Sequence, residues 1–159
     1  DWVQAAGGQV HAIGKIGDIF SMSGIDTLHT GTDQALMRHL FQAVESAEDG
    51  SLTFANFVEF DSLYGHRRDV SGYALALEWF DTQLGSLLPR LRGDDFLLIT
   101  ADHGNDPTWH GTDHTRERVP VLGVGRPAAA IGLVNFEDVA ASIAAHLGVA
   151  SQGGGKSFL

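Results

Sequence analysis

The segment from Ile99 to Glu117 holds the side chains best suited to chemistry, with three Asp and three His within a short stretch. Carboxylates and imidazoles are the ligands that divalent metal ions take in proteins. The apolar run Phe96–Ile99 directly precedes the segment and predicts a buried parallel strand. Asp102 and His103 would then emerge at its carboxyl end, where ligand sites form in open α/β sheets. This pattern indicates metal-assisted phosphoryl chemistry.

A second segment has the same construction. An apolar strand predicted over Leu52–Phe60 ends in Asp61, and a short Gly-containing turn leads to His66 before the next helix. The spacing of Asp61 and His66 is too long for one strand face, but it suits a turn that folds both side chains around one ion. Two such strand ends fit a two-metal site in which both ions hold one phosphate.

Asp and His at strand ends also serve as helix caps and turn formers, and we expect that role for Asp69 and Asn135. A single Asp–His pair would favour this simpler interpretation. Two pairs, together with the later His114, favour metal binding.

These segments resemble the phosphopentomutases of the alkaline phosphatase superfamily. The broader superfamily shares only the Ala-Asp-His-Gly core and a later His, whereas two of the runs found here are much more specific to the pentomutases. The matching runs lie in family order over nearly the whole chain: Val10–Phe20, Asn56–Asp69 with its Gly-His-Arg-Arg-Asp, Thr100–Pro107, Gly111–Glu117 with its Gly-Thr-Asp-His-Thr-Arg-Glu, and Gly155–Leu159.

The resemblance implies an isomerase of nucleoside catabolism that interconverts (deoxy)ribose 1-phosphate and (deoxy)ribose 5-phosphate through a phosphothreonine beside two Mn²⁺ ions. It places Asp61, His66 and His114 as ligands of one ion, and Asp102 and His103 as part of the second site. Lys15 would lie near the substrate phosphate, although a solvated surface lysine is the simpler alternative.

The resemblance also implies that part of the site is missing. Family members are more than twice this long, and the first metal-binding Asp, the phosphorylated Thr and the inserted cap domain all precede the matched region. Thr100, Thr112 and Thr115 do not stand where the family places its nucleophile. We therefore expect residues 1–159 to be the C-terminal part of the metal-binding core domain, with no catalytic nucleophile, inactive alone, and with the missing N-terminal half of the same enzyme as its partner.

Two alternative functions stay open. The first is another enzyme of the superfamily, a phosphatase or a phosphoglycerate mutase, against which the Gly-His-Arg-Arg-Asp run argues. The second is a fragment that binds metal and catalyses nothing. Of the two arginines in that run, Arg67 and Arg68, one could bind a substrate phosphate, or pair with Asp61 or Asp69. We expect His110 to be a loop residue, and His39 and His146 to be surface residues.

Composition is compatible with one compact unit that buries a core of ordinary size, since 43% of the 159 residues are hydrophobic. The chain has no cysteine, no apolar run of membrane-spanning length and a formal charge of −10. Broad nucleic-acid binding needs a basic face and is not expected. We expect a cytoplasmic protein that binds small pentose phosphates and neither nucleic acid nor membrane.

Hydrophobic periodicity predicts alternating strands and helices, the pattern of an α/β fold. We expect a three-layer α/β/α sandwich, a partial alkaline-phosphatase-like core sheet without the cap domain. The predicted strands are 9–13, 52–60, 96–100 and 119–124, and the predicted helices are 33–46, 71–91 and one that begins at Asn135. Residues 18–32 should form a loop, and the Gly153–Gly155 tail should be flexible unless it docks.

Overall fold

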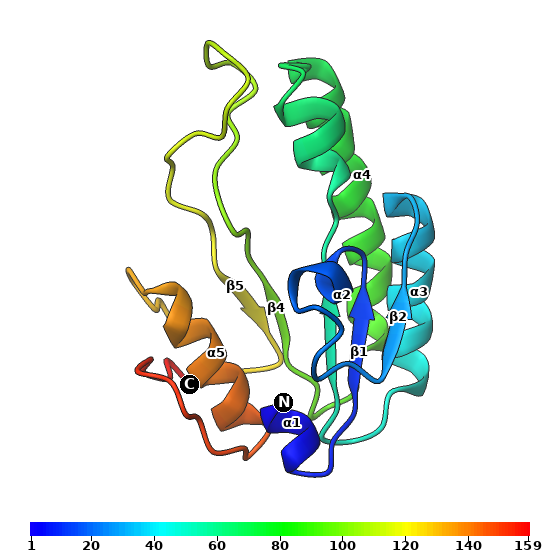
Figure 1. Cartoon of the computed structure of the whole chain (residues 1–159), viewed down its shortest axis with the longest axis vertical. Helices are drawn as coiled ribbons and strands as arrows, with labels where there is room; N and C mark the ends of the chain where they lie inside the picture. Colours follow the sequence, from blue (N-terminus) through cyan, green and yellow to red (C-terminus); the bar gives the residue numbers. More distant parts are fainter.

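The computed structural model describes residues 1–159 and shows strands and helices in alternation (Figure 1). The α/β class predicted from the sequence is confirmed. In chain order the elements are α1 (Trp2–Ala5), β1 (Val10–Ile13), α2 (Ile16–Ile19), β2 (Thr27–His29), α3 (Asp33–Ser46), β3 (Leu52–Ala55), the π-helix η1 (Phe60–Gly65), α4 (Val70–Leu87), the 3₁₀ turn η2 (Leu88–Arg90), β4 (Leu97–Ile99), β5 (Leu122–Val124) and α5 (Phe136–His146).

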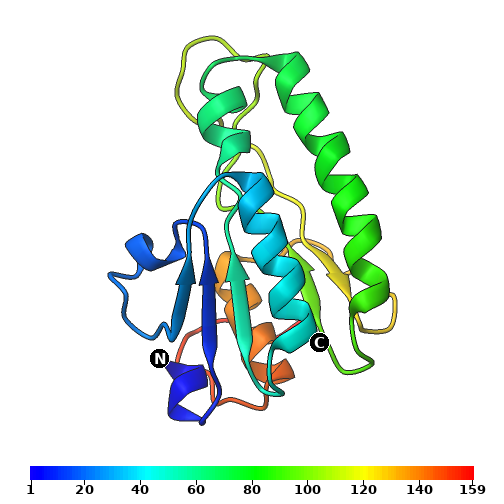
Figure 2. The same ribbon diagram turned by 90° about the vertical axis from the view of Figure 1, so that its right-hand side faces the viewer.

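The main sheet has three parallel strands in the order β2-β1-β3, with His11 opposite Thr27 and Val10 opposite Leu52. Parallel strands need crossover connections, and α3 is the crossover between β2 and β3. Figure 2 shows α3 in front of this sheet and α5 behind it. The layered arrangement expected from the sequence, a sheet between helices, is therefore present.

The helix starts follow capping chemistry. Asp69 accepts the N–H of Gly72 at 2.9 Å and begins α4, as predicted. Asn135 and Asp138 form a reciprocal capping box at α5. At α3, Thr32 is the N-cap and Asp33 is the first helical residue, where the predicted helix also begins. No helix combines the length and the apolar character needed to cross a membrane.

The prediction of a buried parallel strand at Phe96–Ile99 is wrong in its pairing. β4 pairs antiparallel with β5 in a separate two-stranded sheet, with Leu97 opposite Val124, and its residues are only half-buried. Beyond the strands the chain returns alongside itself, and a bridge between Gly104 and Thr115 continues the antiparallel contact. An apolar run predicts that a strand forms, but the path of the following loop determines which strand pairs with it.

The strand predicted over Leu52–Phe60 ends early, at Ala55. Apolar residues continue beyond it, but Phe57 and Phe60 pack edge-to-face against Phe80 of α4, with ring centroids 5.4 and 5.9 Å apart. These aromatic contacts draw the chain away from the sheet and into η1. The predicted loop at 18–32 likewise contains a strand, β2, as well as the end of α2.

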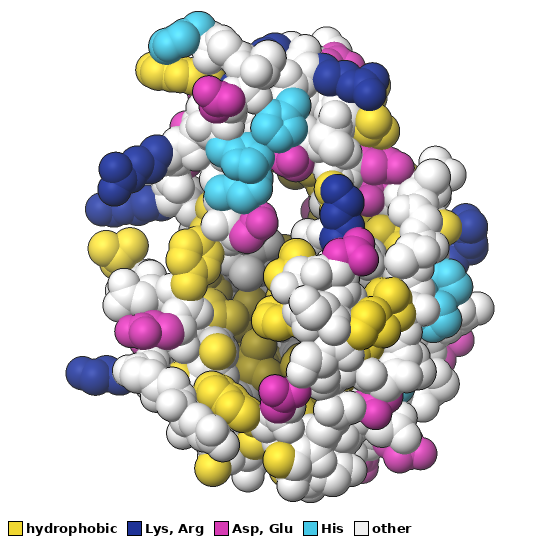
Figure 3. Space-filling view, in the orientation of Figure 1, with side chains coloured by type: hydrophobic (Ala, Val, Ile, Leu, Met, Phe, Trp, Pro, Cys, Tyr) yellow, Lys and Arg dark blue, Asp and Glu magenta, His cyan; other side chains and the backbone are white.

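The core is smaller than the composition suggested, since only 16 of the 159 residues are buried. Its buried residues include Ala12 and Ile13 of β1, Ile16 of α2, and Leu36 and Met37 of α3. Figure 3 shows a hollow with apolar side chains on its floor near the middle of this face of the molecule. Exposed large apolar side chains include Ile19, Phe20, Met22, Phe54, Leu75, Leu77, Leu122, Val124 and Leu133.

The C-terminal tail is docked on α5. The backbone N–H of Lys156 donates to Asp138 Oδ1 at 2.7 Å, and the N–H of Phe158 donates to the buried Ser142 hydroxyl at 3.0 Å. The same Asp138 carboxylate accepts the N–H of Asn135 through Oδ2. These backbone hydrogen bonds, Lys156 first, lower the pKa of Asp138 below its usual value.

Candidate metal centre

Asp61, His66 and His114 converge on one point. The Nε2 atom of His66 lies 3.2 Å from Asp61 Oδ2, and the Nε2 atom of His114 lies 3.3 Å from Asp61 Oδ1. The two Nε2 atoms are 3.1 Å apart. The side chains come from η1 and from the loop between β4 and β5, which are brought together only by the fold.

The π-helix explains how Asp61 and His66 reach the same point. The N–H of His66 donates to the carbonyl of Asp61 at 2.9 Å, so the two residues are joined by the wide i→i+5 hydrogen bond of a π turn. The turn anticipated between them is therefore helical. Short π-helical segments occur often at functional sites.

Thr112 sets the orientation of the His66 ring. The Nδ1 atom of His66 is hydrogen-bonded to the Thr112 carbonyl, which can only accept, so Nδ1 carries the proton. In the neutral ring Nε2 then presents its lone pair toward Asp61 and His114. A hydrogen bond of this kind behind an imidazole fixes the tautomer that ligates a metal.

The geometry fits a divalent ion. Ligand atoms about 2.0–2.2 Å from a metal, at angles between octahedral and tetrahedral, are separated from one another by about 3.0–3.5 Å. Here the two Nε2 atoms are 3.1 Å apart, and they lie 3.2 and 3.3 Å from Oδ2 and Oδ1, the two oxygens of the Asp61 carboxylate. When Nε2 of His114 is also unprotonated, the lone pairs of the two imidazoles and the carboxylate repel one another, and a positive charge between them would offset this repulsion.

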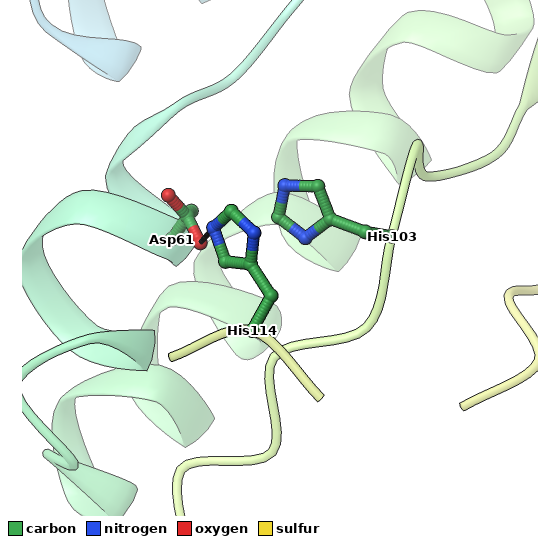
Figure 4. Close-up of side chains that lie close together, drawn as sticks. All are labelled: Asp61, His103 and His114. Atoms are coloured by element: carbon green, nitrogen blue, oxygen red, sulfur yellow. Dashed lines mark ion pairs between the residues drawn. The ribbon is translucent and has the colours of Figure 1, made fainter. Parts of the chain in front are cut away.

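His103 joins the same group. Its ring stacks on His114 with centroids 3.7 Å apart and planes 21° apart. Asp61, His103 and His114 each offer a ligand atom, and these atoms all lie within 4.8 Å of one another (Figure 4). His103 therefore lies beside the Asp61 group as well as beside its sequence neighbour Asp102.

Asp102 is the most open of the predicted ligands. Its side chain is 76% exposed, and its Oδ2 atom lies 3.6 Å from Nε2 of His103. No other protein ligand completes a site around these two groups. Asp102 and His103 thus leave most positions around a second ion to water or to other groups.

Asn105 is a site residue that sequence reasoning missed. It is 8% exposed, and its Nδ2 atom donates to Asp61 Oδ1 at 2.7 Å. Arg68 donates to its Oδ1 atom at 2.6 Å. The run Asp102-His103-Gly-Asn105 gave no signal that the amide turns back to the carboxylate.

Arg68 does not pair with Asp61 or Asp69, one of the two roles considered for it. Its guanidinium pairs with no carboxylate and instead donates to Asn105 and to backbone carbonyls, those of Gly65, Asp106, Gly111 and Asp113. Arg68 has a positive φ of 56°, an uncommon conformation for a residue with a side chain. The neighbouring Arg67 is exposed and forms no hydrogen bond or ion pair within the chain.

The loop that carries His114 is braced by Thr115. Its hydroxyl donates to Glu117 Oε2 at 2.6 Å and accepts the N–H of Asp106 at 2.6 Å. Two hydrogen bonds from Thr108 lower the pKa of Asp106, which keeps the carboxylate charged at this turn. Glu117 thus helps to hold the segment that carries His114.

Lys15 lies in a separate hollow. It follows Gly14, whose φ is +89° and where a Cβ atom would sit 2.2 Å from the Asn56 carbonyl, so only glycine fits between β1 and the end of β3. The adjoining cavity has a volume of about 400 Å³ and is lined by Gly14, Lys15, Asp18, Thr30, Gly31, Asp33, Leu36, Val58, Glu59, Ser62 and Leu63. Lys15 forms no ion pair with these carboxylates. Two of the lining residues, Ser62 and Leu63, belong to η1, so the cavity adjoins that helix.

The remaining histidines lie outside the group. His110 packs against Trp109 with centroids 4.6 Å apart, in agreement with the prediction of a loop residue. His39 and His146, expected on the surface, are half-buried instead. His39 stacks on His29, and His146 packs against Phe96, where burial, followed by the charge of Arg126, lowers the pKa of His146.

Residues 3–151 match the model of the metalloenzyme superfamily. The match covers most of the chain, and the chain belongs to this superfamily. The grouping of carboxylate and imidazole ligands at the end of an α/β fold accords with that membership.

The most similar curated relatives include proteins named phosphopentomutase. That of Rhizobium johnstonii is 52% identical over 157 residues, which cover 96% of this chain and 39% of the relative. That of Rhizobium meliloti is also 52% identical, over 163 residues that cover 100% of this chain and 40% of the relative. The phosphopentomutase of Chelativorans sp. is 51% identical over 164 residues, which cover 100% of this chain and 40% of the relative. The chain thus spans about two fifths of the length of the curated relatives it matches.

Proposed function

We propose that the chain is the C-terminal part of the core domain of a phosphopentomutase, an isomerase that interconverts (deoxy)ribose 1-phosphate and (deoxy)ribose 5-phosphate. The observation that carries the proposal is the convergence of Asp61, His66 and His114, at ligand-like separations, in a chain about half identical to phosphopentomutases. A phosphopentomutase acts on pentose phosphates, and metal ions held at this centre would attract their phosphate groups to a chain whose formal charge is −10.

In this proposal the group holds Mn²⁺. Asp61, His66 and His114 would bind one ion, and Asp102 with His103 would supply two ligands of a second, whose other ligands lie elsewhere in the longer polypeptide. Bound divalent ions neutralise phosphate oxygens and stabilise the charge that develops during transfer. The hydrogen bond from His66 to Thr112 keeps the ligating nitrogen unprotonated, which is the chain's own contribution to binding.

Lys15 would contact the substrate phosphate. It stands on the cavity beside η1 and has no carboxylate partner there, so its ammonium is available to an anion. Gly14 holds the turn that places it. The ammonium would position the phosphate as a point charge while the metal ligands hold the reacting end.

The phosphoryl group must rest on a residue between the two half-reactions. We assign that role to a threonine in the part of the longer polypeptide outside this chain, which would also supply the remaining metal ligand and a cap over the sugar. A cytoplasmic location is part of the same proposal, because nucleoside catabolism takes place there.

A Mn²⁺ titration tests the centre, followed by electron paramagnetic resonance of the free ion. We expect one site in the 159-residue chain, because three protein ligands converge there. His114→Ala removes one of them and should weaken binding by at least tenfold. His110→Ala is the matched control, since His110 is in the same loop and packs against Trp109, and it should leave affinity unchanged. Equal affinity in wild type and His114→Ala would refute the assignment.

A further inference from the structure

We infer that Arg68 and Asn105 are positioning residues that hold the metal-binding carboxylate and the histidine loop in one arrangement. The positioning role presupposes the proposed metal centre. The hydrogen bonds that support it are those of the chain without Mn²⁺. Neither residue is placed to bind the ion. Both act through Asp61, His66 and His114.

The orientation of the Asn105 amide follows from its partners. Arg68 can only donate, and the Asp61 carboxylate, when charged, can only accept. The amide must therefore turn its oxygen to Arg68 and its NH₂ to Asp61. Asn105 Oδ1 accepts from Arg68 at 2.6 Å, and its Nδ2 donates to Asp61 Oδ1 at 2.7 Å. At 8% exposure, water cannot readily replace either contact. One lone pair of Asp61 Oδ1 is thus occupied, and the carboxylate is held with Oδ2 toward His66.

Arg68 links the two segments that meet at the site. It donates to Gly65, at the end of η1, at 3.1 Å, and across the site to Asp106 at 2.7 Å and to Gly111 and Asp113 at 2.6 Å. The last two carbonyls flank Thr112, whose own carbonyl fixes the His66 tautomer. Five donors in a planar fork suit this task, and a lysine could not span the same carbonyls.

Gly65 makes room for the arrangement. A Cβ atom at this position would lie 2.5 Å from Asn105 Nδ2 and 2.7 Å from its Cγ. The end of η1 therefore approaches the amide more closely than any other residue would allow. This close contact leaves Asn105 little freedom to move away from Asp61.

Two measurements on the full 159-residue chain test the inference. Variants Arg68→Gln and Asn105→Leu are titrated with Mn²⁺, with Arg67→Gln as the matched control because Arg67 is exposed and makes no hydrogen bond. Loss of groups that orient ligands costs about 10–100-fold in metal affinity, and we expect that range for both variants and no change for the control. In metal-free protein, imidazole ¹⁵N shifts should show His66 protonated at Nδ1 in wild type and as a tautomer mixture in Arg68→Gln.

Circular dichroism establishes that each variant is folded. If Arg68→Gln does not fold, Arg68→Lys keeps the charge and should still lose affinity. Folded variants with wild-type affinity and an unchanged His66 tautomer would overturn the inference. If wild type binds no Mn²⁺, the proposed metal centre fails, and the His66 tautomer alone then decides for or against the positioning role.

Discussion

At the scale of single residues, Asp33 occupies a position that resists its ionisation. Asp33 is the first residue of α3 and is only 5% exposed, and Glu59 lies nearby. Burial first, and the charge of Glu59 second, raise the pKa of Asp33 to about 6. The backbone N–H of Glu59 donates to its Oδ2 atom at 3.3 Å and offsets part of that effect.

The free energy of unfolding of Asp33→Asn, relative to that of the wild type, should therefore increase as the pH rises. With a pKa of about 6 when folded and 3.8 as its ordinary value, Asp33 is protonated in both states below about pH 4 and costs nothing there. Between pH 4 and 7 the folded state must ionise it, which costs about 2–3 kcal/mol by pH 7. Urea unfolding of both proteins at pH 4 and 7 measures the change. Ser62→Ala, in the same cavity, is the control, and parallel pH curves for Asp33→Asn and wild type would contradict the assignment.

Residue types told much about the centre before its geometry was known. Asp61, His66, His103 and His114 are strong ligands by chemistry, and they do converge. Whether they bind metal stays a prediction. Arg68 and Asn105 could not be found in this way, because guanidinium and amide groups serve many purposes and their partners here are mostly backbone carbonyls distant in sequence.

At the scale of elements, α4 supports the site through η1. Phe60 of η1 packs edge-to-face on Tyr73 and Phe80 of α4, with centroids 5.8 and 5.9 Å apart. Burial there raises the pKa of Tyr73, and the Asp61 charge adds to the rise. The first turn of α4 thus packs against Phe60, the residue next to Asp61.

Removal of the α4 cap should destabilise the chain. Asp69→Ala loses the hydrogen bond to Gly72 N–H, and loss of an N-cap costs about 1 kcal/mol, within a range of 0.5–2. Urea unfolding at pH 7 gives the difference. Glu78→Ala, at an exposed position in the middle of the same helix, should stay within about 0.5 kcal/mol of wild type. Equal losses in the two variants would show that the cap contributes nothing specific.

Helices were easier to predict than strands. The periodic residues and caps gave α3, α4 and α5 nearly at their observed bounds. The apolar runs located β3 and β4 but not where β3 ends or what β4 pairs with, because pairing depends on segments far away in sequence. A π-helix has no periodic signal of its own, so η1 was anticipated only as a turn.

At the scale of the whole molecule, the chain leaves most of its residues at least partly exposed to solvent. It covers 39–40% of the relatives it matches, and few of its residues are buried. The hydroxyl of Thr115 is engaged by Glu117 and Asp106, and Thr112 faces His66 through its carbonyl. The Thr115 hydroxyl is thus held within its own loop.

We expect the isolated chain to show no mutase turnover, because transfer between sugar phosphates needs a covalent acceptor. The chain is incubated with Mn²⁺, a sugar bisphosphate primer and ribose 5-phosphate, and formation of ribose 1-phosphate is followed. A full-length phosphopentomutase serves as the positive control. Turnover comparable with that control would mean that a residue of this chain, Thr112 or Thr115 first among them, acts as nucleophile.

The division into two small sheets has a consequence for association. β3 is bonded only to β1, and β4 only to β5, so each has one edge of unpaired backbone N–H and C=O groups. The exposed side chains of Phe54 on β3 and of Leu122 and Val124 on β5 add apolar surface near these edges. Unpaired edges act as templates for strands of another molecule. Copies of this chain are therefore expected to pair edge to edge as their concentration rises.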